Sequence, residues 1–169
     1  MSRQLISFTF DSPIGRISLT ASAKGLSALT LSPQPTPTAP NQPPRQLIGL
    51  VKRLESYFNG RKVIFPDKLD LSTATPFQIK VWETTRLIPY GETRSYHWVA
   101  EQMGQPAAAR AVGQALARNP LPVIIPCHRV IAGDGKLGGY SGGLEMKQKL
   151  LRLEQLKTTS VREARSPII

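Results

Sequence analysis

Cysteine and histidine are scarce in this chain of 169 residues. It has one cysteine, Cys127, and two histidines, His97 and His128. A single cysteine cannot form a disulfide within the chain, and these residues are too few for a cysteine-rich zinc site. The stability of the fold is therefore expected to come from packing. Any thiol chemistry has to use Cys127.

Long apolar runs are also missing. No stretch approaches the roughly 18 consecutive apolar residues that span a bilayer. Residues 1–10 show neither a long apolar run nor a small-residue cleavage site. The sequence thus predicts a soluble, cytoplasmic protein with no membrane partner.

Acidic residues are half as common as basic ones, 11 against 22, which gives a net charge of +11. An excess of positive charge favours polyanionic partners, because neutralising phosphates releases condensed counterions. Nucleic acid is the natural candidate. On composition alone, a basic protein that is merely kept soluble by its charge is an equal alternative.

Residues 1–75 carry the pattern of a small α/β domain. Three short segments, 5–10, 16–21 and 26–31, are separated by turn-forming residues and predict an antiparallel meander. Six prolines within residues 33–44 predict an extended surface loop. Apolar residues then recur at helical spacing from Leu47 to Phe58, and this helix is expected to cover the sheet.

Residues 76–157 predict a mainly α-helical second domain. The segment Thr75-Pro76-Phe77-Gln78 is typical of a helix start, with threonine as the cap, proline in the first turn and glutamine reaching back to the cap. Ser95 can cap a helix over 96–103, and a Gly-Gln turn separates it from a helix over 106–118. We interpret this pair as a helix-turn-helix.

The second helix of this pair has unusually small side chains. Apart from Arg110, Val112, Gln114 and Leu116, residues 107–117 are alanine or glycine. Such a helix can approach a partner closely, although alanine also simply favours helix, and propensity alone is the stronger explanation. Arg110 favours the explanation that this helix approaches a partner. One long cation on a smooth helix suits insertion into a duplex from which a base has been extruded.

Reactive side chains interrupt an apolar run at residues 123–131, where Cys127 is followed directly by His128. A lone cysteine is more often an inert core residue, because only a thiolate reacts. An adjacent imidazole, which titrates near neutrality, can receive the thiol proton through water. Neighbours on an extended strand point to opposite faces, so this pairing requires a tight turn at Pro126.

A histidine base needs a group that fixes its tautomer, and Glu154 is the candidate. On a helical wheel that begins at Leu144, Glu154 falls inside the apolar arc, where a carboxylate needs a partner. Lys147 lies in the same arc, so an ion pair between these two residues is the structural alternative. Beyond this helix, residues 158–169 are expected to form a flexible tail.

A wider set of motifs surrounds the cysteine. The segment Pro126-Cys127-His128-Arg129-Val130 resembles the signature of the methylated-DNA–protein-cysteine methyltransferases, also called O6-alkylguanine-DNA alkyltransferases. Further matches follow in order across residues 76–154, and a weaker match lies in the N-terminal part. These are Phe77-Gln78, Val81-Trp82, Ile88-Pro89-Tyr90-Gly91, Ser95-Tyr96, Ala108-Ala109-Arg110-Ala111-Val112-Gly113, Asn119-Pro120, Gly139-Tyr140-Ser141-Gly142-Gly143, Leu150-Leu151 and, in the N-terminal part, Ser12-Pro13-Ile14-Gly15. The resemblance implies a ribonuclease-H-like α/β N-terminal domain without nuclease function, and a mainly α, winged helix-turn-helix C-terminal domain that holds the active site.

The resemblance also implies a role for each matching residue. Cys127 resembles the alkyl acceptor, His128 its water-mediated base, and Glu154 the residue that orients the histidine. Asn119 resembles the hinge that braces the cysteine turn, and Tyr96 the hydroxyl that helps neutralise the leaving guanine. The residues implied to bind the base are Tyr96, Val130, Ser141, Tyr140 and Leu116, and those implied to bind DNA are Arg110, as the finger that replaces the flipped nucleotide, with Ala109, Ala111, Gly113 and Ser95.

The implied function is direct-reversal DNA repair. A methyl or other alkyl group would pass from O6 of guanine, and by extension from O4 of thymine, to Cys127 after base flipping. A thioether has no easy leaving group and no second thiol is present, so each molecule is expected to act once, without a cofactor. Some relatives in this family hold a structural zinc in the N-terminal domain, but this chain lacks the cysteines for that site, so no metal is expected. The expected partner is double-stranded DNA containing O6-alkylguanine, bound by a protein that is monomeric in solution, with cooperative binding on DNA left open.

Three other functions compete with this one. A lesion-recognition protein of the alkyltransferase-like kind would lack the acceptor cysteine, which this chain has. A transcription factor would use the helix-turn-helix for binding, but no second DNA-binding module is evident in the sequence. A cysteine hydrolase of the Cys-His type would turn over repeatedly and would not need Arg110.

Overall fold

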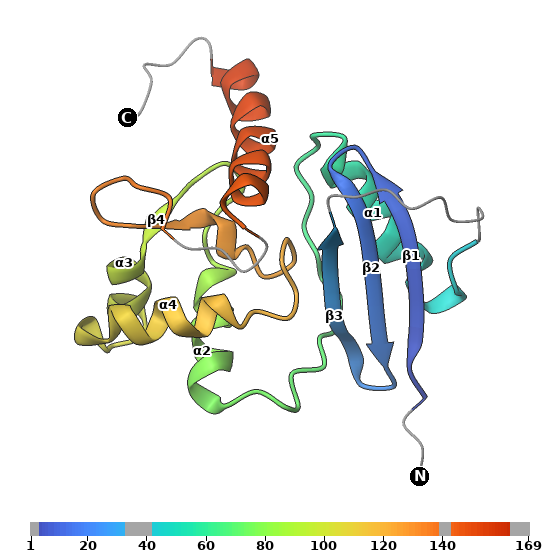
Figure 1. Ribbon diagram of the computed structural model, residues 1–169, viewed down its shortest axis with the longest axis horizontal. Coiled ribbons are helices and arrows are strands. Elements are labelled where there is room, and N and C mark those ends of the chain that lie inside the picture. The colour runs from blue at the N-terminus through green and yellow to red at the C-terminus, as the bar shows by residue number, and fades with distance from the viewer. Residues whose placement is uncertain (1–3, 33–41, 139–142, 163–169) are drawn as a thin grey trace.

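The computed structural model describes residues 4–32, 42–138 and 143–162, with side chains as far as residue 155. These residues form a three-stranded sheet with one helix against it and, beside them, a mainly helical half (Figure 1). The expected fold class, an α/β part followed by a mainly α part, is confirmed. Among the described helices, none combines the length and the apolar character that crossing a membrane requires.

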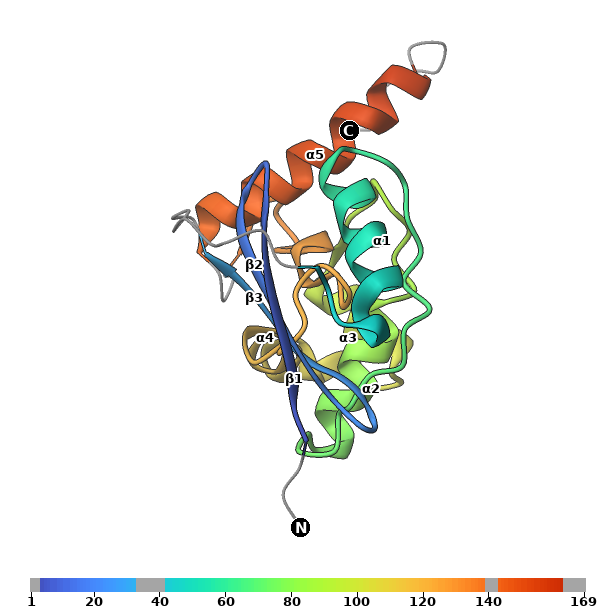
Figure 2. The same ribbon diagram turned by 90° about the vertical axis from the view of Figure 1, so that its right-hand side faces the viewer.

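The N-terminal sheet is the predicted antiparallel meander. Its strands lie in sequence order: β1 (Ile6–Ser12), β2 (Gly15–Ser22) and β3 (Gly25–Ser32). Alternate residues such as Ile17 and Leu19 are buried, because successive side chains of a strand point to opposite faces. Helix α1 (Ile48–Phe58) follows a single 3-10 turn, η1 (Arg45–Leu47), and lies against the buried face of the sheet (Figure 2). Most of the predicted proline-rich loop, 33–41, lies outside the described residues.

Strand β3 connects the sheet to the rest of the molecule. The N–H of Leu26 donates to the carbonyl of Lys68 at 2.8 Å, and the N–H of Leu29 donates to the carbonyl of Pro120 at 2.9 Å. Gly25, with φ of 141°, permits the close approach of the Lys68 carbonyl, because a Cβ there would lie 2.4 Å from that oxygen. Buried residues of both halves also form a single hydrophobic core. The division into domains at residue 75 stays a prediction.

The first helices of the second half begin with the caps that the sequence predicted. At α2 (Pro76–Thr85), the hydroxyl of Thr75 accepts from the N–H of Gln78 at 3.1 Å, and the Gln78 side chain accepts from the N–H of Thr75 at 3.0 Å. At α3 (Tyr96–Gln102), the hydroxyl of the cap residue Ser95 accepts from the N–H of Trp98 at 2.9 Å. A turn and the 3-10 segment η2 (Pro106–Ala108) lead into α4 (Ala109–Ala117), so the helix-turn-helix is present.

The last elements frame the cysteine segment. After the 3-10 turn η3 (Cys127–Arg129), β5 (Val130–Ile131) pairs in parallel with β4 (Arg94–Ser95). Helix α5 (Leu144–Arg162) then passes beside the sheet. It continues past Thr158, where a flexible tail was expected, because residues 144–162 contain neither proline nor glycine to end a helix. Residues 163–169 lie outside the described part.

Candidate active site

Cys127 lies on a tight turn rather than on a strand. Pro126 has φ of −79° and ψ of 63°, and the N–H of Cys127 donates to the carbonyl of Ile125 at 2.7 Å, which is the geometry of an inverse γ-turn. The residues from Cys127 to Arg129 then form η3. The turn required at Pro126 is therefore present. Cys127 and His128 are not held on opposite faces of an extended strand, so the two side chains can act together.

The loop before the cysteine is braced by Asn119. Its side-chain N–H2 donates to the carbonyl of Ile125 at 2.9 Å and to Sγ of Cys127 at 3.0 Å, and its Oδ1 accepts from the N–H of Leu121 at 2.8 Å. Val123 is held at φ of 76°, where a β-branched residue is strained. Asn119 thus fixes a strained loop and also places a donor on the sulfur, which stabilises negative charge there.

The residue next to the thiol belongs to a buried pair. His128 is 0% exposed and Glu154 is 1% exposed, and Nε2 of His128 lies 2.5 Å from Oε2 of Glu154. A carboxylate only accepts, so Nε2 carries the hydrogen of the neutral ring and Nδ1 carries the lone pair. Nδ1 is buried and has no hydrogen-bond partner among the residues described. It is therefore the atom that can take up a proton.

The protonation states of the pair follow from burial and charge. Burial lowers the pKa of His128, although the negative charge of Glu154 acts in the opposite direction. The ring is therefore neutral near pH 7, which is the form that can act as a base. Burial alone would raise the pKa of Glu154, but His128 and Arg129 together hold it well below its usual range.

The cation that pairs with Glu154 is Arg129. Nε of Arg129 donates to Oε1 at 2.8 Å and Nη2 donates to Oε2 at 3.1 Å, while the backbone N–H of Gly91 donates to Oε1 at 3.1 Å. The hydroxyl of Tyr57, on α1, donates to Oε2 at 2.5 Å. The carboxylate is thus held by groups from three separate segments of the chain.

Lys147, the alternative partner for Glu154, donates to backbone carbonyls. Its Nζ donates to the carbonyl of Val130 at 2.7 Å and to that of Leu137, and it lies 5.9 Å from the ring centroid of Tyr96. Burial lowers the pKa of Lys147 to about 8, and the electrostatic interaction with Cys127 opposes this effect. Lys147 therefore ties α5 to the segment that follows the cysteine.

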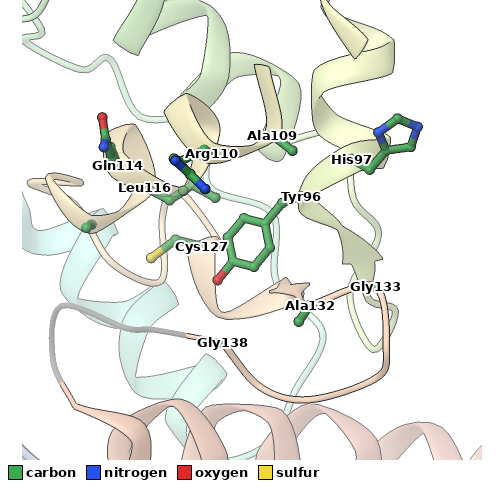
Figure 3. Close-up of a pocket in the computed structure, with 12 residues that line it drawn as sticks. Tyr96, His97, Ala109, Arg110, Gln114, Leu116, Cys127, Ala132, Gly133 and Gly138 are labelled. Atoms are coloured by element: carbon green, nitrogen blue, oxygen red, sulfur yellow. The ribbon is translucent and has the colours of Figure 1, made fainter. Parts of the chain in front are cut away.

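A cavity of about 730 Å³ opens beside the sulfur, a volume typical of ligand sites. Figure 3 shows Cys127 and the ring of Tyr96 on its wall, with Arg110 projecting from α4 on the same side. The other lining residues come from α3, from α4 and from the loop after β5: His97, Ala109, Gly113, Gln114, Leu116, Ala117, Ala132, Gly133 and Gly138. The predicted residues Tyr96, Leu116, Arg110, Ala109 and Gly113 therefore surround the cysteine.

The ring of Tyr96 lies close to two glycines of the cavity wall. A Cβ at Gly138, where φ is 69°, would lie 2.5 Å from the Tyr96 hydroxyl, and a Cβ at Gly113 would lie 3.7 Å from the ring. Glycine is therefore required at position 138, whereas a Cβ at position 113 would make an ordinary contact with the ring.

Comparison with known proteins identifies the family. Residues 76–156 match the family model described as 6-O-methylguanine DNA methyltransferase, DNA binding domain, and residues 5–71 match the model of its ribonuclease-like domain. The chain is 47% identical over 150 residues to the methylated-DNA–protein-cysteine methyltransferase of Mycolicibacterium paratuberculosis, covering 87% of this chain and 90% of that protein. The chain belongs to the 6-O-methylguanine DNA methyltransferase family.

Solved structures of this family have the same fold. The structure of Mycobacterium tuberculosis OGT in complex with DNA is 46% identical, with a TM-score of 0.77, and the match covers 88% of this chain and 92% of that one. The O6-methylguanine methyltransferase of the same organism is 41% identical, also with a TM-score of 0.77, over 98% and 97% of the two chains.

The remaining residues that the family resemblance singled out occupy different places. Val130 is buried in β5 and is not among the residues that line the cavity. Ser95 caps α3, and Ala111 lines a separate depression between α4 and the start of α2. Tyr140 and Ser141 lie outside the described residues. The roles predicted for all of these residues stay predictions.

Three groups that hold the His128–Glu154 pair were not predicted from the sequence: Arg129, Tyr57 and the backbone of Gly91. Arg129 was recognisable in principle, because a charged residue in the apolar run 123–131 needs a partner. Tyr57 offered only a weaker signal, a hydroxyl on the core face of an amphipathic helix. Nothing in the local sequence indicates that the N–H of Gly91 points at Glu154.

Proposed function

We propose that this family member removes alkyl groups from O6 of guanine in double-stranded DNA and retains them on Cys127. One observation carries the proposal. The sulfur of Cys127 borders a cavity of about 730 Å³, it accepts a hydrogen bond from Asn119 at 3.0 Å, and the next residue, His128, is paired with Glu154. A nucleophile, a base and a group that orients the base are thus assembled beside space for a ligand.

The reaction begins with the transfer of the thiol proton, through a water molecule, to Nδ1 of His128. The carboxylate of Glu154 stabilises the imidazolium that forms. The thiolate then attacks the alkyl carbon, and a sulfur–carbon bond forms as the carbon–O6 bond breaks. The electron pair of the broken bond stays with guanine, which takes up a proton as it leaves. Tyr96 lines the cavity with Cys127 and is the proposed source of that proton. The phenolate of Tyr96 then regains a proton from water, and the imidazolium of His128 releases one to water, so the charges cancel.

The proposed reaction is stoichiometric. A thioether carries no leaving group that water can displace easily, and the chain has no second cysteine to resolve it. Each molecule therefore repairs one lesion, and the same chemistry serves methyl and larger alkyl groups, and O4-alkylthymine as a second substrate. Cavity-lining residues such as Leu116 would set the size limit.

The proposed partner is duplex DNA, bound through α4. Cys127 is only 4% exposed, so a base inside a duplex can reach the sulfur only after leaving the stack. Arg110 is exposed at the cavity, and the helix that carries it has small side chains. These features support a role for Arg110 in filling the gap left by the base, with the net charge of +11 supporting phosphate contacts. We further propose a monomer that acts on chromosomal DNA inside the cell.

The decisive experiment is intact-protein mass spectrometry after incubation with a duplex that contains one O6-methylguanine. The expected result is a gain of one methyl group per protein molecule, located on Cys127 by peptide mapping and absent from Cys127→Ser. Tight lesion binding without mass gain would instead support a recognition protein. Continued product release beyond one equivalent would support a cysteine hydrolase.

A further inference from the structure

Tyr57 brings a hydroxyl group from the N-terminal half into the buried pair. The residue is 0% exposed on the core face of α1, and its hydroxyl donates to Oε2 of Glu154 at 2.5 Å. The same hydroxyl oxygen lies 3.4 Å from Nε2 of His128. Three aromatic rings pack edge-on against the Tyr57 ring and fix its position: Phe58, Phe65 and Tyr90.

Tyr57 and His128 compete for one carboxylate oxygen. Both lie 2.5 Å from Oε2 of Glu154. Burial and the negative charge of Glu154 raise the pKa of Tyr57 well above its ordinary value, so the hydroxyl keeps its proton and donates. Each donor withdraws part of the negative charge that would otherwise act on the other. The stabilisation that Glu154 gives to a protonated His128 therefore depends on Tyr57.

Other titratable or charged groups face the same histidine. Arg129 of η3 and Lys147 of α5 are positive and disfavour its protonation. Tyr90 lies near Glu154 and Tyr57, and Cys127 precedes the histidine in η3. These four groups belong to the helical half, whereas Tyr57 is a neutral donor from the N-terminal half.

We propose that Tyr57 is a positioning residue of the alkyl-transfer reaction. By sharing Oε2 of Glu154 with His128, its hydroxyl sets how readily the histidine takes up and releases a proton. The link to activity rests on the proposed function, but the effect on His128 does not. The N-terminal half would thus act on the chemistry of Cys127 as well as on packing.

The test compares Tyr57→Phe with Tyr90→Phe. Each substitution removes one hydroxyl from the same aromatic cluster and keeps the ring. The Tyr90 hydroxyl is buried and has no hydrogen-bond partner among the residues described, so Tyr90→Phe is a matched control. Removing the Tyr57 hydroxyl leaves more of the Glu154 charge to act on His128, which favours the imidazolium.

The first readout is an NMR titration of the histidine ring in full-length protein. The chain has two histidines, and His97→Gln assigns the signals. In Tyr57→Phe we expect the pKa of His128 to rise by about one unit, the effect of one hydrogen bond to a charged group. In Tyr90→Phe we expect no change. An unchanged His128 titration in Tyr57→Phe, or equal shifts in both variants, would overturn the inference.

The second readout is the pH dependence of alkyl transfer to Cys127 from free O6-alkylguanine base. A histidine with a raised pKa stays protonated to a higher pH and cannot act as a base until that pH is passed. The acid limb of the pH–rate profile should therefore move upward by about one pH unit in Tyr57→Phe. Transfer would then be roughly tenfold slower on the acid side and equal to wild type above the shifted limb. A shifted titration with an unshifted rate profile would reject the role in the reaction. Failure of wild-type Cys127 to gain mass would reject the proposed function and leave the titration result standing.

Discussion

The side of Cys127 that faces the protein interior differs in construction from the side that faces the cavity. Toward the interior, Glu154 accepts hydrogen bonds from Tyr57, His128, Arg129 and the Gly91 backbone, and all of these contacts are buried or nearly so. Toward the cavity, α4 presents alanine and glycine together with Gln114, Leu116 and the exposed Arg110. The reactive pair is therefore fixed in one arrangement, while the cavity side leaves room for a ligand.

This difference predicts unequal costs of substitution. A buried charge that loses its partner is strongly destabilising, because nothing replaces the water that burial removed. An exposed arginine that loses its contacts is simply solvated. Substitutions on the interior side of Cys127 should therefore lower both the stability of the fold and the rate of alkyl transfer. Substitutions on the cavity side should affect the reaction with the substrate and leave stability unchanged.

The largest effect is expected for Glu154→Gln. The amide keeps the shape but cannot balance Arg129 or stabilise protonated His128, so alkyl transfer should fall by about 100-fold or more. The free energy of unfolding should fall by ~3 kcal/mol, measured by urea denaturation. Glu145→Gln is the control on the same helix, because Glu145 is exposed and its pair with Lys149 contributes at most ~0.5 kcal/mol. Wild-type stability in Glu154→Gln would contradict the proposed difference between the two sides.

The same carboxylate predicts how stability changes with pH. The pKa of Glu154 is depressed in the folded state, whereas it is about 4.3 in an unfolded chain. Its contribution is therefore fully present above about pH 5 and is lost as the pH falls toward the folded-state value. Wild type should lose stability over this acid range more steeply than Glu154→Gln. Parallel curves for the two proteins would show that Glu154 is not the group responsible.

The sequence predicts best those features of the fold whose determinants lie within one short segment. The capping box of Thr75 and Gln78, the Ser95 cap and the three strands depend on residues a few positions apart, and all are present. The placement of Glu154 in an apolar arc also indicated a buried carboxylate in need of partners. These features follow from hydrogen bonding and periodicity within one segment.

The sequence did not predict the contacts between segments that are far apart in the chain. Tyr57 and Glu154 are 97 positions apart, and Arg129 and Glu154 are 25 positions apart. A helical wheel compares Glu154 only with residues of its own helix, which is why it suggested Lys147. The positive φ of Val123 is likewise imposed by the surrounding loop, and no local preference of valine indicates it.

A smaller effect, limited to duplex substrates, is expected for Arg110→Ala. If Arg110 replaces the extruded base, transfer from duplex DNA should slow by roughly thirtyfold, the equivalent of ~2 kcal/mol of unstacking. Transfer from free O6-alkylguanine should stay close to wild type, as should thermal stability. Arg118→Ala, at the end of the same helix and away from the cavity, controls for the loss of one positive charge. Equal losses on both substrates would remove the base-flipping role from Arg110.

The smallest effect is expected for Tyr96→Phe. Tyr96 lies on the cavity side, but its ring also contacts the interior, since the buried Lys147 lies over it. Loss of the hydroxyl should slow transfer about tenfold, the value of one hydrogen bond to the leaving guanine, on duplex and free base alike. DNA affinity should not change, because the ring remains. Single-turnover rates and a binding titration separate the two quantities, and a normal transfer rate would mean that another group protonates the guanine.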